Sequence, residues 1–291
     1  MRYVAWSEID PLRALQFSAD GFNEAVGGGP NIDQQLASVD LQASLAAMEG
    51  NEIVAVTQCG RATQMFAGET RTVLCNTGTA VRDDYRGQGV GKRLLSILTS
   101  SMDAHDAKAV YAWGKNAGLS GPLWTAGPSL MHRKIEPRFE DVSDSQHRVR
   151  ESDADLFCDL QNHFAARVQG ALMLDPLTYN SLCYAPGSRV TNFSLEDERG
   201  YVAVGWGVEH EVLKHLVISD VFMAPGQDIQ QVVSSVAKER GYESVSVLDS
   251  GNWPQAAFAG EIGTFVSTLY SYGTVSDAGP DNNPVRTPFY F

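Results

Sequence analysis

The feature that most constrains the fold is residues 81–92, VRDDYRGQGVGK, which join an apolar strand pattern to an apolar helix pattern. Three glycines, Gly87, Gly89 and Gly91, fall close together in this segment. Glycine has no Cβ, so a ligand can approach the main chain of such a turn closely. Amides at the start of a helix favour an anion, because the helix dipole is positive there. The segment therefore predicts a strand–turn–helix unit that binds a pyrophosphate.

Two familiar phosphate loops differ from this segment in spacing. A P-loop requires Ser or Thr after its Gly-Lys pair, whereas Arg93 follows Gly91 and Lys92 here. The dinucleotide fingerprint, GxGxxG, differs from the GxGxG of residues 87–91. The segment instead resembles the acyl-CoA signature of the GNAT acetyltransferase superfamily, Arg/Gln-x-x-Gly-x-Gly/Ala, at every defined position of residues 86–91. The alternative is a glycine turn that only joins a strand to a helix.

The resemblance implies that acetyl-CoA is the cosubstrate and that its pyrophosphate lies on the main chain of the turn. It also implies that the pantetheine arm bonds to the preceding strand, and that an asparagine after the next strand contacts the arm. As a helix cap, Asn116 has an equally good explanation. The residues that the resemblance assigns to cofactor binding are Thr79, Ala80, Val81, Arg86, Gly87, Gln88, Gly89, Val90, Gly91, Lys92 and Asn116.

The first half of the chain alternates strand and helix patterns around this segment. A helix is expected to open at Asp10-Pro11, since aspartate caps helices and proline suits their first turn. A short second helix is expected at 31–39. The third begins at Val90 and carries an apolar stripe along one face. The expected strands are 2–6, 41–48, 52–58, 72–81 and 110–113.

The second half repeats this plan about 135 residues later. Its expected strands are 191–195, 201–207, 212–223 and 244–248, and its helix begins at Ile229 and stops at Gly241. The sequence therefore predicts an α/β protein of two tandem GNAT domains, each a mixed, mostly antiparallel sheet flanked by helices. The expected domains are 1–140 and 150–291, with a linker near 136–152, in an organisation that resembles the mycothiol synthase group.

The two copies differ at the turn that follows the fourth strand. In the second copy this turn is residues 223–228, MAPGQD, which has one glycine and no arginine. Pro225 removes an amide donor, and Asp228 would face the phosphates. We therefore expect one acyl-CoA site, in the N-terminal half, and a degenerate C-terminal half.

The general acid and base cannot be assigned from the sequence. In histone-type relatives a glutamate base lies on the fourth strand, where this chain has Cys75, and no carboxylate occurs within 72–81. The resemblance also implies a tyrosine that protonates the thiolate, at the position of Leu123. Tyr111 is a fallback acid, although a tyrosine that opens a buried strand more often serves packing. An ordered water or the second domain would then supply the base.

Cysteines and histidines show no pattern that binds a metal. Cys59, Cys75, Cys158 and Cys183 are scattered, which predicts reduced, buried thiols rather than zinc ligands or disulfides. A structural role is expected for His210 and His215. The run at 132–134 is expected to be a solvated strand edge. Three tryptophans line either a substrate cleft or the core: Trp113, Trp124 and Trp253.

Composition limits the partners of this chain. Its 291 residues carry a formal net charge of −13, which disfavours nucleic acid and suits a cationic amine. No apolar run or leader pattern suggests a membrane span or secretion, so a cytoplasmic protein is expected. The expected function is acetyl-CoA-dependent N-acetylation of a small-molecule amine. The alternatives are a non-catalytic acyl-CoA-binding protein and an acyltransferase that uses a longer acyl-CoA; the acceptor amine and the oligomeric state are not determined.

Overall fold

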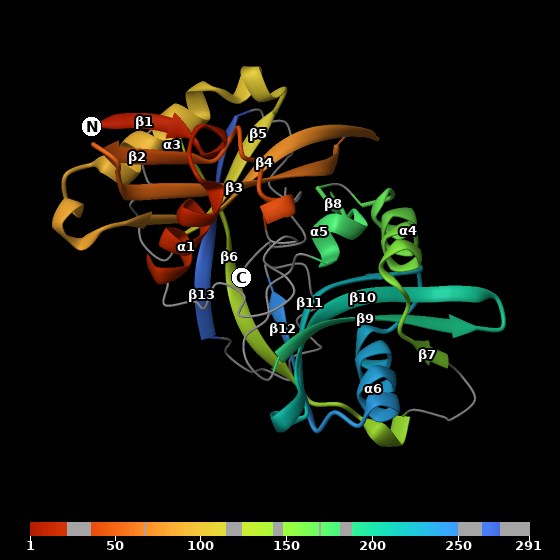
Figure 1. Cartoon of the computed structure of the whole chain (residues 1–291). Helices are drawn as coiled ribbons and strands as arrows, with labels where there is room; N and C mark the ends of the chain where they lie inside the picture. Colours follow the sequence, from red (N-terminus) through yellow and green to blue (C-terminus); the bar gives the residue numbers. More distant parts are fainter. Residues whose placement is uncertain are drawn as a thin grey trace.

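Two halves of similar plan make up the protein (Figure 1). The computed structural model describes residues 1–21, 36–66, 68–114, 124–141, 148–168, 170–180, 188–249 and 264–273. We call residues up to 141 the N-terminal half and those from 148 the C-terminal half. No helix in these ranges is long and apolar enough to cross a membrane.

The N-terminal half follows the predicted order of strands and helices. Its elements are β1 (Arg2–Ala5), α1 (Pro11–Gly21), β2 (Leu45–Glu49), β3 (Glu52–Phe66), β4 (Glu69–Val81), α3 (Val90–Ser100), β5 (Ala109–Gly114) and β6 (Thr125–Ile135). At the start of α1, Asp10 Oδ1 accepts the Leu12 amide, as predicted. The strand expected at 41–48 begins only at Leu45, because Asp40 Oδ1 accepts two amides and holds 41–43 as a turn. Of the helix expected at 31–39, residues 36–39 are described: 36–38 are helical, whereas Val39 forms an isolated β-bridge with Gly60, so the helix ends one residue earlier than expected.

The C-terminal half repeats this order. Its elements are β7 (Arg148–Arg150), α4 (Ala154–Ala165), β8 (Leu172–Met173), α5 (Pro176–Asn180), β9 (Ser188–Asp197), β10 (Gly200–His210), β11 (His215–Met223), α6 (Ile229–Arg240), β12 (Ser244–Asp249) and β13 (Thr264–Gly273). The strand expected at 212–223 begins at His215, because a 3-10 turn and Lys214, with a φ of 43°, precede it. As predicted, Gly241 ends α6 in the left-handed region.

A continuous sheet of 13 strands joins the halves, in the order β1-β2-β3-β4-β5-β13-β6-β12-β11-β10-β9-β7, with β8 paired to β3. Each half has an antiparallel run that ends in one parallel pair, β4 with β5 and β11 with β12. The predicted mixed α/β architecture is therefore confirmed. Strand β13 lies between β5 and β6, and β6 also pairs with β12, so the halves share their last strands.

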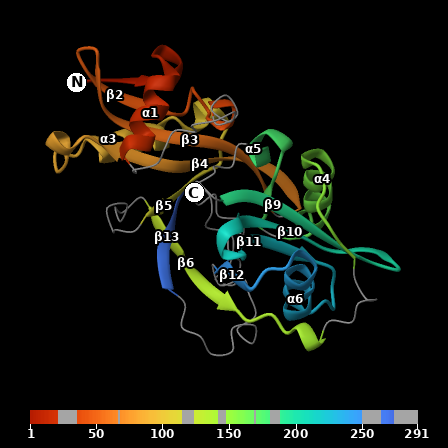
Figure 2. The same cartoon turned by 60° about the horizontal axis from the view of Figure 1, so that its bottom comes forward.

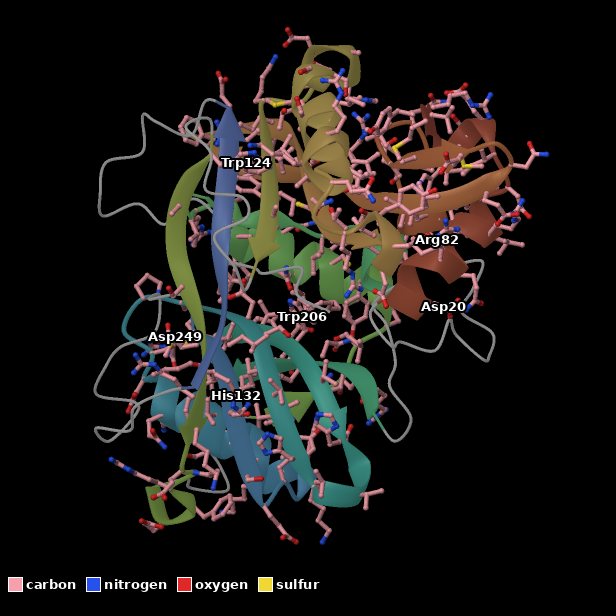
Figure 3. The ribbon with its side chains drawn as sticks, turned by 90° about the vertical axis from the view of Figure 1, so that its left-hand side faces the viewer. Asp20, Arg82, Trp124, His132, Trp206 and Asp249 are labelled. Atoms are coloured by element: carbon pink, nitrogen blue, oxygen red, sulfur yellow. The ribbon has the colours of Figure 1, made fainter. Side chains whose placement is uncertain are left out.

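Helices cover the sheet on both faces (Figure 2). In the N-terminal half, α3 packs on Leu74 and Val110, whereas the adjacent residues Cys75 and Tyr111 face the opposite side. There they join a core with Phe157 of α4 and with residues of β10 and β11. Helix α4 thus lies between the two parts of the sheet that the halves contribute, and Figure 3 labels Trp206 of this shared core at their junction. Helix α6 packs on the other face of the C-terminal half.

The expectation that 132–134 lie on a strand edge is wrong, although Lys134 is exposed as expected. Strand β6 is internal, because β12 pairs with one side of it along 131–135 and β13 pairs with the other side as far as His132. Arg133 Nε lies 3.1 Å from Asp249 Oδ2 in an ion pair that is largely buried. His132 Nε2 lies 2.7 Å from Ser246 Oγ, so the run makes specific contacts across the sheet.

Candidate functional site

The parallel strands β4 and β5 separate near their carboxyl ends. They pair from Val73 with Ala109 to Asn76 with Ala112, and the described strands then diverge. Beyond that point β5 continues beside β13, while β4 runs on to Val81 with β3 as its partner. Along 77–81, β4 therefore has a side with no described strand beside it. We call this side the slot.

The main chain of β4 offers hydrogen-bonding groups to the slot at alternate residues. Arg82 N donates to Val54 O at 2.9 Å, which fixes the alternation of an antiparallel pair. By that alternation the amide and carbonyl of Ala80 point to β3, and those of Thr79 and Val81 point to the slot. The carbonyl of Val81 already accepts Arg86 Nε at 3.1 Å. Thr79 thus offers an amide and a carbonyl to the slot, and Val81 offers an amide.

Three glycines shape the turn between β4 and α3. Gly87 and Gly89 have φ values of 77° and 78°, in the left-handed region that glycine adopts without strain. At Gly91 a Cβ would lie 3.2 Å from Val81 Cγ2 and 3.4 Å from Thr79 Cγ2. Gly91 therefore lets α3 pack close to the strand that borders the slot.

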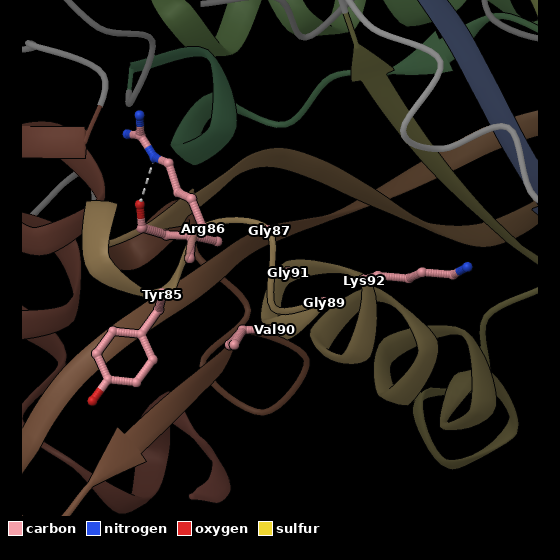
Figure 4. Close-up of a pocket in the computed structure, with 8 residues that line it drawn as sticks. Tyr85, Arg86, Gly87, Gly89, Val90, Gly91 and Lys92 are labelled. Atoms are coloured by element: carbon pink, nitrogen blue, oxygen red, sulfur yellow. Dashed lines mark hydrogen bonds between the residues drawn. The ribbon is translucent and has the colours of Figure 1, made fainter.

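Several main-chain amides at this turn have no acceptor among the described residues. No described residue accepts a hydrogen bond from the main-chain N–H of Gly87, Gly89, Val90, Gly91 or Lys92, and the first amide engaged in α3 is that of Arg93, which donates to Gly89 O at 2.9 Å. These amides adjoin a pocket of about 340 Å³ (Figure 4). The free donors and the positive helix end make the pocket suited to a pyrophosphate.

The polar side chains of the turn between β4 and α3 stabilise the turn through hydrogen bonds and ion pairs. Arg86 bonds Val81 O and pairs with Asp83 at 3.0 Å, and Gln88 Nε2 donates to Asp84 O at 2.7 Å. Arg86, Gln88 and Lys92 are all exposed. The two nearby acids are each paired with an arginine, since Asp84 also binds Arg82. Their negative charge is thereby offset beside the pocket.

Neither Cys75, at the position of the relatives' glutamate base, nor Tyr111, the fallback acid, is free to act in the slot. Burial raises the pKa of the Cys75 thiol to about 12, so it carries no charge at neutral pH. Tyr111 is also buried, and its hydroxyl donates to Gln64 Oε1 at 2.9 Å. Burial raises the pKa of Tyr111 as well. Tyr111 faces the core shared by the halves, away from α3, which favours the packing alternative.

Several predicted residues lie outside the described part of the chain: Asn116, Leu123, Cys183 and Trp253. The side chain of Trp113 is likewise not described, and Trp124 packs against the core beneath α3. Cys59, Cys75 and Cys158 are buried and unpaired, as predicted. Within the described ranges no group of three or more His, Cys, Asp or Glu side chains is arranged to hold a metal ion. His215 bonds Ser244 and Ser246, as expected of a structural histidine.

The C-terminal half has a matching slot, but the main-chain amide that faces it already has a hydrogen-bond acceptor. Strands β11 and β12 pair only as far as Ile218 with Val247. The amide equivalent to that of Thr79 belongs to Val221, and it donates to Asp220 Oδ1 at 2.8 Å. At the turn, Asp228 Oδ1 accepts the Gln230 amide and caps α6. The contrast supports the prediction of one acyl-CoA site.

One polar cluster beside the slot was missed from the sequence. The side chains of Thr57, Asn76 and Thr79 meet under the start of α3, with the two threonine hydroxyls 2.8 Å apart. Thr57 is fully buried and Asn76 nearly so. Polar residues at positions of an apolar strand that face a helix are the signal that could have revealed the cluster.

Residues 12–118 match the sequence model of the acetyltransferase (GNAT) family. No curated protein sequence matches the chain. The structure is similar to a GCN5-related N-acetyltransferase from Anabaena variabilis, with a TM-score of 0.74 and 12% identity over 93% of this chain and 72% of that one. A GCN5-related N-acetyltransferase from Kribbella flavida gives 0.64 and 17%, over 92% and 71%. A tandem GNAT protein from the clavulanic acid biosynthesis pathway gives 0.55 and 10%, over 94% and 98%.

These matches agree with the order of elements in both halves. The family model covers the slot, the glycine turn and α3, where the sequence signature lies. At these identities the structural matches establish the fold alone, and they do so across nearly the whole chain. Residues 12–118 are therefore similar to the acetyltransferase (GNAT) family, within a chain whose fold is that of tandem GNAT proteins.

Proposed function

We propose that this protein is an acetyl-CoA-dependent N-acetyltransferase that acts on a small-molecule amine and binds acyl-CoA in its N-terminal half. The observation that carries the proposal is the set of main-chain amides at the start of α3, which no described residue engages. They adjoin a slot in which Thr79 and Val81 present further main-chain groups. A pyrophosphate on the amides and an extended pantetheine arm in the slot use both features.

The chain would act chiefly by positioning the thioester. The glycine turn holds the pyrophosphate, and the Thr79 carbonyl and the Val81 amide hold the amides of the arm. The thioester then lies at the inner end of the slot, beside Asn76. An amine attacks its carbonyl carbon, and the Thr79 amide stabilises the oxyanion. As the C–S bond breaks, the ammonium proton passes through water to the departing thiolate.

A small acceptor is favoured because the C-terminal half covers much of the sheet face opposite α3. Strand β8 pairs with β3 through Thr63 and Met173, and α4 packs on the core that holds Cys75 and Tyr111. A long peptide needs an open groove, which this arrangement restricts. The net charge of −13 adds long-range attraction for a cationic amine.

The rival function is binding of acyl-CoA without catalysis. It is favoured by the neutral, buried Cys75 at the position of the family's base and by the hydrogen bond that occupies Tyr111. An acyltransferase with a longer acyl donor is the second alternative. All three functions use the same glycine turn, so binding of CoA alone does not separate them.

Two measurements test the proposal. Calorimetric titration with CoA is expected to show binding with a stoichiometry of one. Incubation with acetyl-CoA and a panel of amines is then expected to release free CoA thiol with at least one amine, and mass spectrometry identifies the acetylated product. Tight binding without turnover on any amine favours the binding protein, and faster turnover of a longer acyl-CoA favours the second alternative. Absence of CoA binding contradicts all three.

A further inference from the structure

Strand β4 contains a β-bulge at the inner end of the slot. Gln58 pairs with Gly78 and Cys59 with Asn76, so Thr77 is an extra residue on β4. A bulge bends its strand and redirects the groups that follow it. This bulge comes directly after Asn76, the last residue that pairs with β5. It therefore lies where β4 leaves β5, just before the slot-facing amide of Thr79.

The side chain of Asn76 bridges this bulge. Its Nδ2 lies 2.5 Å from Thr57 Oγ1, 3.1 Å from Gln58 O and 3.3 Å from Gly78 O, so its hydrogens bond groups on both strands. Thr57 Oγ1 in turn lies 2.8 Å from Thr79 Oγ1. A chain of contacts thus runs from Asn76 to the residue whose amide faces the slot.

The C-terminal half shows that the fold does not need this bridge. Its β11 has a bulge at the matching place, because Trp206 pairs with Asp220 and Gly207 with Ile218. Ile218 takes the position of Asn76, so this bulge forms without an asparagine.

The slot of that half has also lost the rest of the arrangement. Gly205 takes the position of Thr57, and a Cβ there would lie 2.5 Å from the ring of Phe193. The Val221 amide is taken up by Asp220 Oδ1. The bridge and the open amide therefore occur together in one half and are absent together in the other.

We propose that Asn76 is a positioning residue that keeps the Thr79 amide directed at the thioester carbonyl of bound acyl-CoA. The inference rests on the proposed function, because it requires a thioester in the slot. Asn76 does not touch the reacting atoms; it acts through Thr57 and Thr79. When the amine adds to the carbonyl carbon, the C=O electron pair moves to oxygen. The aligned amide donates to that oxyanion until the C–S bond breaks.

The test compares Asn76→Asp with a matched control, Asn192→Asp. Both asparagines are buried and donate two or more hydrogen bonds from Nδ2, in the case of Asn192 to Ser152 O at 2.9 Å and Tyr179 Oη at 3.0 Å. Each variant keeps side-chain size and loses those donors. Asn76→Ile, which copies Ile218, serves as the second variant where Asn76→Asp does not fold.

The readouts are the affinity for CoA and the infrared carbonyl band of bound acetyl-CoA labelled with 13C at the carbonyl carbon. In the wild type and in Asn192→Asp, a hydrogen bond to the thioester carbonyl is expected to lower the frequency of this band. In the Asn76 variant the frequency is expected to rise toward its value in water-free solvent. CoA affinity is expected to stay within about twofold, because the glycine turn is untouched. With an acceptor amine, kcat is expected to fall about tenfold to a hundredfold, since loss of one whole oxyanion donor costs about 10²–10³.

An unchanged band and unchanged kcat in an Asn76 variant that binds CoA would overturn the role of Asn76 and leave the proposed function standing. Equal band shifts in the Asn76 and Asn192 variants would also overturn it, since general loosening would then explain both. A wild-type protein that does not bind CoA contradicts the proposed function itself.

Discussion

We predict that replacement of Gly89 by aspartate weakens CoA binding through the added negative charge and lowers stability through backbone strain. Gly89 has a φ of 78° and no atom within 4 Å of an added Cβ, and Gly226 in the C-terminal half has a φ of 86° and equally open surroundings. An L-residue in this region costs about 1–2 kcal/mol. Because the strain is the same in free and bound protein, it lowers stability in both variants and leaves affinity unaffected.

The carboxylate adds a second effect at Gly89 alone. Two like charges about 4 Å apart near a protein surface repel by about 4 kcal/mol, which corresponds to about three orders of magnitude in affinity. Calorimetry is therefore expected to show CoA affinity about a thousandfold weaker in Gly89→Asp and unchanged in Gly226→Asp. Gly89→Ala, which adds strain and a Cβ without charge, should lose stability and lose less affinity than Gly89→Asp. Equal losses of affinity in the two aspartate variants would refute the assignment of the site to the N-terminal half.

Three further results are expected. Tyr111→Phe should keep turnover within about twofold and lower the unfolding free energy by about 1 kcal/mol, because Gln64 loses one donor; a loss of turnover above tenfold restores Tyr111 as the acid. Burial, together with the nearby His210, His132 and Lys134, lowers the pKa of His215. The folded protein therefore binds a proton at this histidine more weakly than the unfolded chain does, where the pKa is about 6.5. The contribution of His215 to the free energy of unfolding is thus fully present above that pH and is lost as pH falls below it. The melting temperature should fall more steeply from pH 7 to pH 5 in the wild type than in His215→Gln. Parallel plots of melting temperature against pH for the two proteins contradict this. Gln161→Met should leave the unfolding free energy unchanged or raise it by about 1 kcal/mol, because neither buried amide atom has a partner among the described residues; a drop in stability indicates a bound water.

Local signals predicted the parts of the fold that local chemistry determines. Asp10 and Gly241 mark helix ends through their own hydrogen bond and backbone conformation, so both ends were correct. Strand β2 was placed four residues early, because the apolar pattern from Leu41 conceals a turn held by Asp40. The duplicated order of elements followed from hydrophobic periodicity together with turn and helix-stop signals.

Contacts between segments that are distant along the chain could not be predicted from the sequence. The charge of the run at 132–134 favoured a solvated edge, yet β12 pairs with all three residues and β13 pairs with His132, and both strands come from the other half of the chain. Sharing of β6 and β13 between the halves also affects the expected boundary between 140 and 150. A cut there would separate β13 from β5, its neighbour in the sheet. The domain ranges 1–140 and 150–291 therefore remain a prediction.

The candidate site was predictable where it depends on main chain and not where it depends on partners. Glycine spacing identified the turn, and the structure gives its amides no described acceptor. The role of Asn76 depends on a bulge and on Thr57 of the adjacent strand, which no spacing along β4 reveals. Likewise, the hydrogen bond from Tyr111 to Gln64 joins residues on separate strands, so its alternatives stayed open.

Hydrogen–deuterium exchange of the intact chain with and without CoA tests the central claim most directly, since it follows the amides themselves. CoA is expected to slow exchange at residues 87–92 and at Thr79 and Val81, and to leave residues 221–228 unchanged. Protection confined to 221–228, or none in either half at saturating CoA, would contradict the account.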